Sequence, residues 1–208
     1  MARPSQRAIA EQDCYLALRQ RQFRIAADVV TEAFAALPEV ERVALIGSVA
    51  RPLEREVPRF RAFARAGIGV WHECKDLDLA VWLGRLDRLD RLRKMRSRAL
   101  RQLFAERNVG VADHQVEVFV LEPGSDRYLG RLCLYNACPK GKPDCYVPGC
   151  GAQPFLRQDQ DFRFHPDALA PERCVTLFDR AAGIRRRAAD LPAAEEARQL
   201  DGRAGSGS

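Results

Sequence analysis

Long apolar runs are missing from this chain of 208 residues. No stretch approaches the roughly 20 consecutive apolar residues that a helix needs to cross a bilayer. The first residues, Met1 to Asp13, also lack the apolar stretch of a secretory signal peptide. We therefore expect a cytoplasmic protein with no membrane partner. The length suits a single domain with an embellishment.

Lysine is scarce as well, because only four of the 34 basic residues are lysine and arginine supplies the rest. The 28 acidic residues leave a formal net charge of +6, which suits a polyanionic partner without requiring one. Nucleic acid therefore stays open as a partner. The seven cysteines are an odd number in a chain without a secretory signal. Reduced thiols or a metal site are accordingly favoured over a disulfide framework.

The hydrophobic pattern predicts an α+β fold, in which a mixed β-sheet is flanked by helices. We expect, in chain order, one or two helices over Ile9–Leu37, a strand over Val43–Ile46, a short helix over Val49–Val57, a helical segment over Phe60–Ala66, a strand with its lead-in over Ile68–Leu83, a helix over Leu86–Phe104, strands over Val116–Val120 and Cys174–Phe178, and a basic helix over Arg180–Leu191. The arginine-rich face of the helix over Leu86–Phe104 is interpreted as a solvated surface, with nucleic-acid contact as the alternative. Residues 192–208 read as a disordered tail.

Two aspartates, Asp76 and Asp78, stand two residues apart at the start of an apolar strand. In an extended strand they project to one side, while the leucines between and after them project to the other. Neighbouring carboxylates repel each other unless solvent or a cation compensates them, and a hard ion such as Mg²⁺ does this well. The alternative is a polar strand face that simply meets water. Ala80 and Trp82 lie on the same face and argue against that alternative.

The stretch Val43–Ile46 runs into Gly47-Ser48, where a strand is expected to give way to a helix. Such a turn presents backbone N–H groups and a hydroxyl to a bound anion. A glycine-serine turn by itself more often only caps a helix. A phosphate cradle followed by a carboxylate pair, however, is typical of a nucleoside triphosphate site. Glu117, the one acid within the strand over Val116–Val120, is a candidate third carboxylate.

These residues resemble the nucleotidyltransferase superfamily that includes DNA polymerase beta, and in particular its small single-domain bacterial-type members. The resemblance covers roughly Val43 to Val120. It implies that Gly47, Ser48 and Arg51 bind the nucleotide. It also implies that Asp76, Asp78 and Glu117 are catalytic and hold two Mg²⁺ ions. The interval between Ser48 and Asp76 is longer than the family's usual interval, which predicts an insertion around residues 54–69 that walls the acceptor site.

The resemblance implies a Mg²⁺-dependent enzyme that transfers a nucleoside monophosphate from an NTP to an unidentified acceptor and releases pyrophosphate. The alternative is a catalytically idle protein of the same fold, either antitoxin-like or nucleic-acid-binding. The implied organisation is one nucleotidyltransferase-like domain over residues 1–191, with N-terminal helices (1–40), a catalytic core (43–122) and a Cys-rich segment (130–165). Asp159 and Asp161 form a second Asp-x-Asp, but no apolar residues flank them, so we treat this pair as coincidental.

A second motif lies in the Cys-rich segment, where four cysteines are spaced C-x4-C-x6-C-x4-C among prolines and glycines. Four thiolates suit a closed tetrahedral Zn²⁺ site, and such a site can order a segment that has no core of its own. We therefore expect structural zinc on Cys133, Cys138, Cys145 and Cys150. Cys133 also fits as a small core residue. The alternative fourth ligands are His165, His72 and Cys74.

Overall fold

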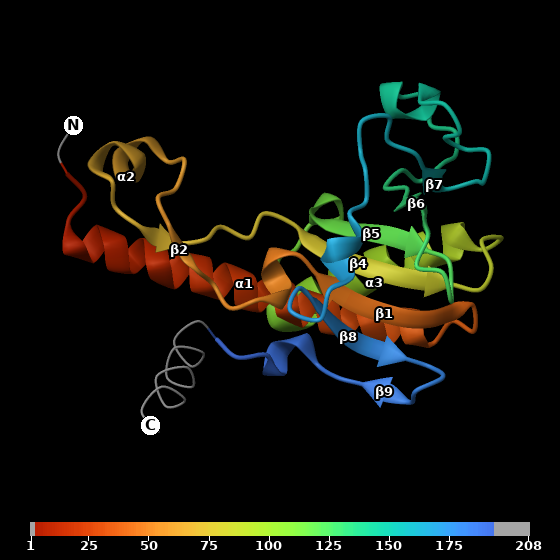
Figure 1. The fold of residues 1–208 in the computed structure, drawn as a ribbon, viewed down its shortest axis with the longest axis horizontal. Helices are drawn as coiled ribbons and strands as arrows, with labels where there is room; N and C mark the ends of the chain where they lie inside the picture. The colour runs from red at the N-terminus through yellow and green to blue at the C-terminus, as the bar shows by residue number, and fades with distance from the viewer. Residues whose placement is uncertain (1–2, 194–208) are drawn as a thin grey trace.

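The longest element of the protein is a single helix, α1 (Gln6–Ala35). The computed structural model describes residues 3–193. Ser5 caps α1 by accepting a hydrogen bond from the amide of Ala8 at 3.2 Å. The apolar stripe of the helix, which includes Phe23 and Val30, is buried. The prediction of helix over Ile9–Leu37 is therefore confirmed, as one continuous element (Figure 1).

The sheet has seven strands in the order β7-β6-β5-β4-β1-β8-β9. Their bounds are β1 (Val40–Ile46), β4 (Leu77–Leu83), β5 (Val116–Leu121), β6 (Tyr128–Leu132), β7 (Leu156–Arg157), β8 (Cys174–Asp179) and β9 (Ile184–Arg185). Every pair is antiparallel except β4 with β5, which are parallel and joined through α3 (Leu89–Arg107). The protein is therefore a mixed α+β structure with helices flanking a mixed sheet.

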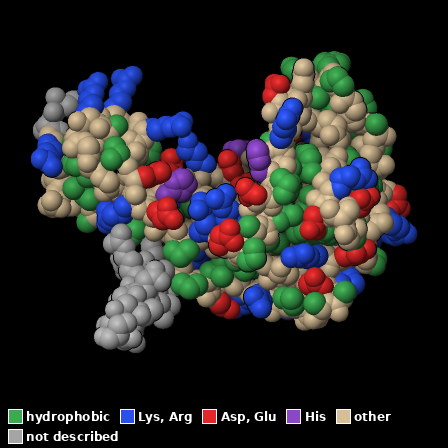
Figure 2. Space-filling model, in the orientation of Figure 1, with side chains coloured by type: hydrophobic (Ala, Val, Ile, Leu, Met, Phe, Trp, Pro, Cys, Tyr) green, Lys and Arg blue, Asp and Glu red, His purple; other side chains and the backbone are tan. Residues whose placement is uncertain are grey.

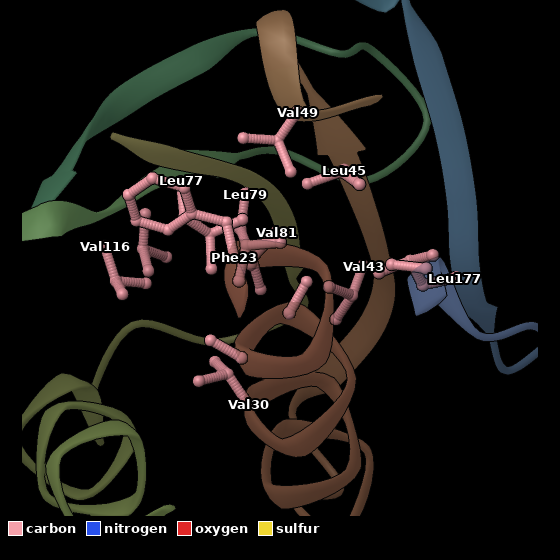
Figure 3. Packing of buried hydrophobic residues seen from close by; sticks show 14 of the residues in the cluster. Phe23, Val30, Val43, Leu45, Val49, Leu77, Leu79, Val81, Val116 and Leu177 are labelled. Atoms are coloured by element: carbon pink, nitrogen blue, oxygen red, sulfur yellow. The ribbon is translucent and has the colours of Figure 1, made fainter. Parts of the chain in front are cut away.

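Both faces of the central strands are covered. Alternate residues of β1, β4 and β5 pack against α1 and α3 in the main core, as Val43 and Leu79 do (Figure 3). The opposite face carries Ala80, Trp82 and Phe119, which pack against the segment of residues 162–174. The face of β4 that carries Asp78 is therefore not a simple solvated surface, because side chains cover it beyond the aspartate.

The interval between β1 and β4 forms an arm, which we define as β2 (Arg55–Glu56), α2 (Arg61–Ala66) and β3 (Val70–Trp71). In Figure 1 the arm lies over the N-terminal half of α1. Asp13 of α1 joins the two, since its carboxylate accepts hydrogen bonds from the Arg55 guanidinium at 2.7 Å and from the Trp71 amide at 2.9 Å. The expected insertion thus has secondary structure of its own and a defined contact with the body.

The prediction of a helix over residues 49–57 is wrong. Only one 3₁₀ turn (Ser48–Ala50) follows β1, and Arg51 is already extended at φ −104° and ψ 159°. The cause is Pro52, because a proline forces the residue before it out of the helical region. No Ser48 side-chain cap forms, so the turn does not place the positive end of a long helix at the site.

The prediction of a basic helix over residues 180–191 is also wrong. The chain turns at Gly183, where φ is +65°, and returns as β9 beside β8. A glycine adopts this left-handed conformation without the strain that a side chain would add. The strands β6 and β7 were not predicted, whereas the strand over Cys174–Phe178 is confirmed as β8. The predicted disordered tail falls almost wholly on residues 194–208, outside the described part of the chain.

The interpretation of the α3 arginines as one solvated face fails at Arg96. This side chain is 0% exposed. Its guanidinium lies 3.4 Å from the carboxylate of Asp113 and 3.4 Å from the carbonyl oxygen of Val116, to which it donates. Arg96 therefore joins α3 to the start of β5. Within residues 3–193, neither α1 nor any other helix combines the length and apolar character that a membrane span requires.

Candidate functional site

A cleft lies between the arm and the body of the protein. In Figure 2 the surface is hollowed between two raised lobes, and acidic and histidine side chains gather at the bottom of the notch. The cavity there has a volume of about 360 Å³. Its lining residues come from the Gly-Ser turn, the arm and the start of β4: Ser48, Glu56, Pro58, Arg59, Phe60, His72, Glu73, Lys75, Asp76 and Asp78.

Strand register brings the predicted acids and the Gly-Ser turn together. Asp78 is paired with Ile46 of β1 on one side and with Glu117 of β5 on the other. The next residue after Ile46 is Gly47, and a Cβ on that glycine would lie 2.8 Å from the Asp78 carboxylate. Gly47 also has φ +74°, a conformation that side chains rarely adopt. Glycine is therefore required here on two independent grounds.

The Asp78 carboxyl is crowded by burial and by charge. Burial raises its pKa to about 7, with further contributions from the negative charges of Glu117 and Asp76, while Arg131 opposes the rise. Asp76 precedes β4 and is exposed. The two aspartates thus differ: one is half-buried beside the glycine turn, and the other stands at the rim of the cleft.

Glu117 already has a partner that no local pattern in the sequence indicates. Arg131 on β6 forms an ion pair with the Glu117 carboxylate and lies 3.1 Å from the carboxylate of Asp159. Its guanidinium also stacks over Phe162, 4.0 Å from the ring centroid. Asp159 therefore helps to hold the Arg131 guanidinium, which neutralises Glu117. It belongs to the Asp-x-Asp pair that we interpreted as coincidental. Its only sequence signal was the Asp-x-Asp spacing, and that spacing pointed to a different role.

Two buried side chains of α1 fix the shape of the Gly-Ser turn. Gln20 donates to the carbonyl of Arg51 at 2.7 Å, and Arg24 donates to the carbonyls of Val49 and Arg51 at 3.1 Å each. Burial lowers the pKa of Arg24. These bonds replace the helix that the turn does not form, since they satisfy carbonyl groups that would otherwise be unpaired. The Arg51 side chain does not line the main cleft but lines a smaller adjoining cavity of about 80 Å³, with Ser48 and His72.

The arm contributes cleft residues that sequence reasoning missed. Arg59 and Phe60 face the carboxylates across the cavity, and Glu56 pairs with His72 at 3.0 Å between Oε1 and Nδ1. No local motif distinguishes these residues, because only the folding back of the arm places them there. Cys74 lies beneath the turn, where burial raises its pKa and the Ser48 hydroxyl is a hydrogen-bond partner. His72 and Cys74 are thus engaged here, rather than in the Cys-rich segment.

The Cys-rich segment between β6 and β7 forms a lobe of its own, at the upper right of Figure 1. Its four cysteines are free thiols. Burial raises the pKa of Cys133, and the charges of Cys138, Cys145 and Cys150 raise it further, so all three lie within electrostatic range of Cys133. His165 is exposed and precedes the 3₁₀ turn Pro166–Leu169.

Neither predicted metal site is closed. Among residues 3–193, no three His, Cys, Asp or Glu side chains are already arranged so that they could hold a metal ion. This holds for the predicted Mg²⁺ ligands of the cleft and for the predicted Zn²⁺ ligands of the Cys-rich segment alike.

Comparisons of the chain with protein-family models, with curated proteins and with solved structures found no match. The function therefore has to be inferred from the chemistry of the cleft.

Proposed function

We propose that this protein is a Mg²⁺-dependent nucleotidyltransferase, which transfers a nucleoside monophosphate from an NTP to an acceptor hydroxyl and releases pyrophosphate. One observation carries the proposal: Asp78 lies directly between the Gly47-Ser48 turn and Glu117, at the floor of a cleft. A carboxylate beside a glycine-serine turn is the arrangement that a metal-bound triphosphate needs. The β1, β4 and β5 arrangement is also compatible with a nucleotidyltransferase-like fold.

The donor set of the cleft fits magnesium. All candidate ligand atoms are oxygens, which hard cations prefer, and Asp78 lies within electrostatic range of two further carboxylates, Glu117 and Asp76. Mg²⁺ commonly takes only one or two protein carboxylates and completes its shell with water and substrate phosphates. A closed protein cage is therefore not required. Asp76 and Asp78 would hold the metal, and the triphosphate would complete the site.

The roles of the chain's own residues follow from their positions. Ser48 and the backbone of the turn bind the phosphates, and Lys75 and Arg59 supply positive charge from the cleft wall. Bound Mg²⁺ supplies charge neutralisation of the triphosphate and lowers the pKa of the acceptor hydroxyl. The acceptor oxygen attacks the α-phosphorus, the bond to the bridging oxygen breaks, and pyrophosphate leaves. Glu117 lies beside Asp78 in the register, and its ion pair with Arg131 would have to open before it could take the hydroxyl proton.

The ion pair between Arg131 and Glu117 favours a second function, because Glu117, the predicted third carboxylate, is already paired with a guanidinium. In this alternative the protein binds nucleotide or nucleic acid without transfer. The two functions differ in one measurable outcome, which is the release of pyrophosphate in the presence of an acceptor.

The first experiment is calorimetric titration of NTP into the protein with Mg²⁺ and with EDTA. Wild type is compared with the variant Asp76→Ala plus Asp78→Ala, for which we expect a loss of affinity of at least about tenfold, or about 1.4 kcal/mol. Asp87→Asn plus Asp90→Asn is the matched control, because these acids at the start of α3 do not line the cleft. Equal affinity for wild type and the cleft variant would refute the proposal.

The second experiment measures transfer directly. The protein is incubated with α-phosphate-labelled NTP and Mg²⁺ against pools of RNA, protein and small-molecule hydroxyl acceptors, and pyrophosphate release is followed. Label transfer that the cleft variant lacks supports the enzyme. Mg²⁺-dependent NTP binding without transfer to any pool supports the idle alternative.

A further inference from the structure

The lobe, which is the part of the Cys-rich segment that spans residues 134–155, has no hydrophobic core of its own. None of residues 134–155 is buried, although the structure describes all of them. A short 3₁₀ turn and an isolated bridge between Cys150 and Gln153 are its regular structure. Phe155 at the end of the stretch is half-buried against the main core, but a segment of this length with so little apolar burial does not offset the conformational entropy lost on ordering it. Some other interaction has to order the lobe.

Backbone contacts gather the cysteines at the base of the lobe. The amide of Cys133 donates to the carbonyl of Phe155 at 2.8 Å, and the amide of Gly151, next to Cys150, donates to the carbonyl of Leu156 at 3.5 Å. The first and last cysteines of the motif therefore both flank the start of β7. A Cβ on Gly151 would lie 3.7 Å from the sulfur of Cys138, which brings the second cysteine to the same place.

The fourth thiol, Cys145, is surrounded by backbone amides of the turn that follows Cys138. The amide of Lys140 lies 3.4 Å from the Cys145 sulfur and donates to it. The amides of Lys142 and Gly141 also point to that sulfur. The contact with Lys140 fixes the Cys145 sulfur within the turn that follows Cys138. Lys140 and Lys142 add positive charge beside the thiols.

We infer that Cys133, Cys138, Cys145 and Cys150 bind one structural Zn²⁺ ion, independently of the proposed activity. Four thiolates give the closed tetrahedral shell that structural zinc takes, with no position for a substrate. Cys133 and Cys150 flank the start of β7 and Cys138 lies against Gly151, although no three such side chains among residues 3–193 are arranged to hold a metal. Zinc binding therefore draws the sulfurs together and rigidifies the lobe, so that metal binding and ordering of residues 134–155 are one process.

The test begins with metal analysis of the full-length protein, expressed with zinc and purified without chelator. About one zinc per chain is expected. The variant Cys138→Ser plus Cys145→Ser should lose the metal, whereas the matched control Cys14→Ser plus Cys174→Ser, which removes two thiols outside the motif, should keep it. Substitution of Co²⁺ should give intense thiolate-to-cobalt absorption in wild type and the control alone. Zinc absent from wild type, or an iron–sulfur spectrum in its place, would overturn the inference.

A second measurement guards against a variant that simply fails to fold. Hydrogen exchange of the wild-type protein is compared before and after zinc removal by a chelator. Peptides within residues 134–155 should lose protection at least tenfold, while peptides of β4 and α1 keep theirs. Unchanged protection in the lobe would contradict the proposed coupling between zinc and order. These assays need no nucleotide, so a protein without zinc would leave the nucleotidyltransferase proposal standing. A protein without NTP binding would likewise leave the zinc inference standing.

Discussion

Replacing Asp78 with asparagine should stabilise the metal-free protein at alkaline pH. The asparagine side chain has the shape of the aspartate but carries no charge, so it fits beside Gly47 without the repulsion that Glu117 and Asp76 exert on the native carboxylate. A substitution in a candidate catalytic residue that increases stability is unusual, because most point substitutions destabilise. The reasoning therefore makes a prediction that a purely structural role for Asp78 would not make.

The magnitude follows from the pKa of Asp78. Its ordinary value is 3.8 and its value in the folded protein is about 7. Below about pH 4 the carboxyl is protonated in both the folded and unfolded states and has no effect. As the pH rises from about 4 to about 7, the unfolded state releases the proton first, so stability falls and then levels off above about 7. The full difference between the two pKa values corresponds to about 4 kcal/mol of unfolding free energy, since each pKa unit is worth about 1.4 kcal/mol.

We expect Asp78→Asn to recover about half of this unfolding free energy, because the half-buried Asp78 side chain keeps some contact with water. A gain of about 2 kcal/mol corresponds to a rise in Tm of about 5 °C for a chain of this size. The assay is urea and thermal unfolding in EDTA at pH 5, 6, 7 and 8. The difference between Asp78→Asn and wild type should grow across that range. Asp76→Asn is the control, and its exposed position predicts a change below about 1 kcal/mol.

Magnesium should reverse the order of stability of wild type and Asp78→Asn. At pH 8 it should stabilise wild type, whose ionised Asp78 would be a ligand under the proposed function, and should leave Asp78→Asn unchanged. Because protons compete with the metal for this carboxylate, stabilisation by Mg²⁺ should weaken as the pH falls below about 7. An Asp78→Asn variant that is equally or less stable than wild type at pH 8 in EDTA would refute the account of a crowded, uncompensated carboxylate.

Three further predictions concern the groups that hold the cleft together. Gly47→Ala should lower the free energy of unfolding in urea by about 1–3 kcal/mol, because φ is +74° and the added methyl group meets Asp78. The same substitution should lower NTP affinity at least tenfold in calorimetry. Wild-type stability together with wild-type affinity would contradict the close approach of Gly47 to Asp78. Arg24→Met should cost about 2–4 kcal/mol in urea unfolding by leaving buried carbonyls unpaired, and a cost under about 0.5 kcal/mol would contradict its role in the turn. Arg131→Gln should raise the pKa of Asp78 further, since the guanidinium opposes that rise, and should release Glu117; an unchanged Asp78 titration by NMR would show that Arg131 does not act on the cleft.

The elements that sequence reasoning predicted are those with an uninterrupted hydrophobic period. The helix α1 and the strands β1, β4, β5 and β8 each show the spacing of residues buried on one or both faces. The strands β7 and β9 have only two residues each, too few to show a period. They form because neighbouring strands supply hydrogen-bond partners. The segment after Gly47 was mistaken for a helix, although Pro52 keeps Arg51 extended; Gln20 and Arg24 then satisfy the carbonyls that a helix would have paired.

The residues of the candidate site also fall into two groups, those that local sequence patterns reveal and those that they do not. Gly47, Ser48, Asp76 and Asp78 were accessible to sequence reasoning because they belong to short local patterns next to strands. Glu117 required only the assumption that β5 lies beside β4, and the register Asp78 with Glu117 shows that it does. Whether these residues act together as proposed is what the NTP and transfer experiments test.

The remaining cleft residues could not be found from local patterns, because each reaches the site by a different long-range contact. Phe60 and Arg59 arrive only because Asp13 of α1 holds the base of the arm. Arg131 lines a separate cavity together with Asp159, and the β5–β6 pairing brings its guanidinium to Glu117. Under the proposed function, the arm supplies charge that the acceptor would meet in the cleft, so acceptor choice would depend on a part of the fold that local sequence describes least. Exchanging Arg59 for glutamate should accordingly change acceptor preference more than NTP affinity, and an equal loss of both would place Arg59 on the triphosphate instead.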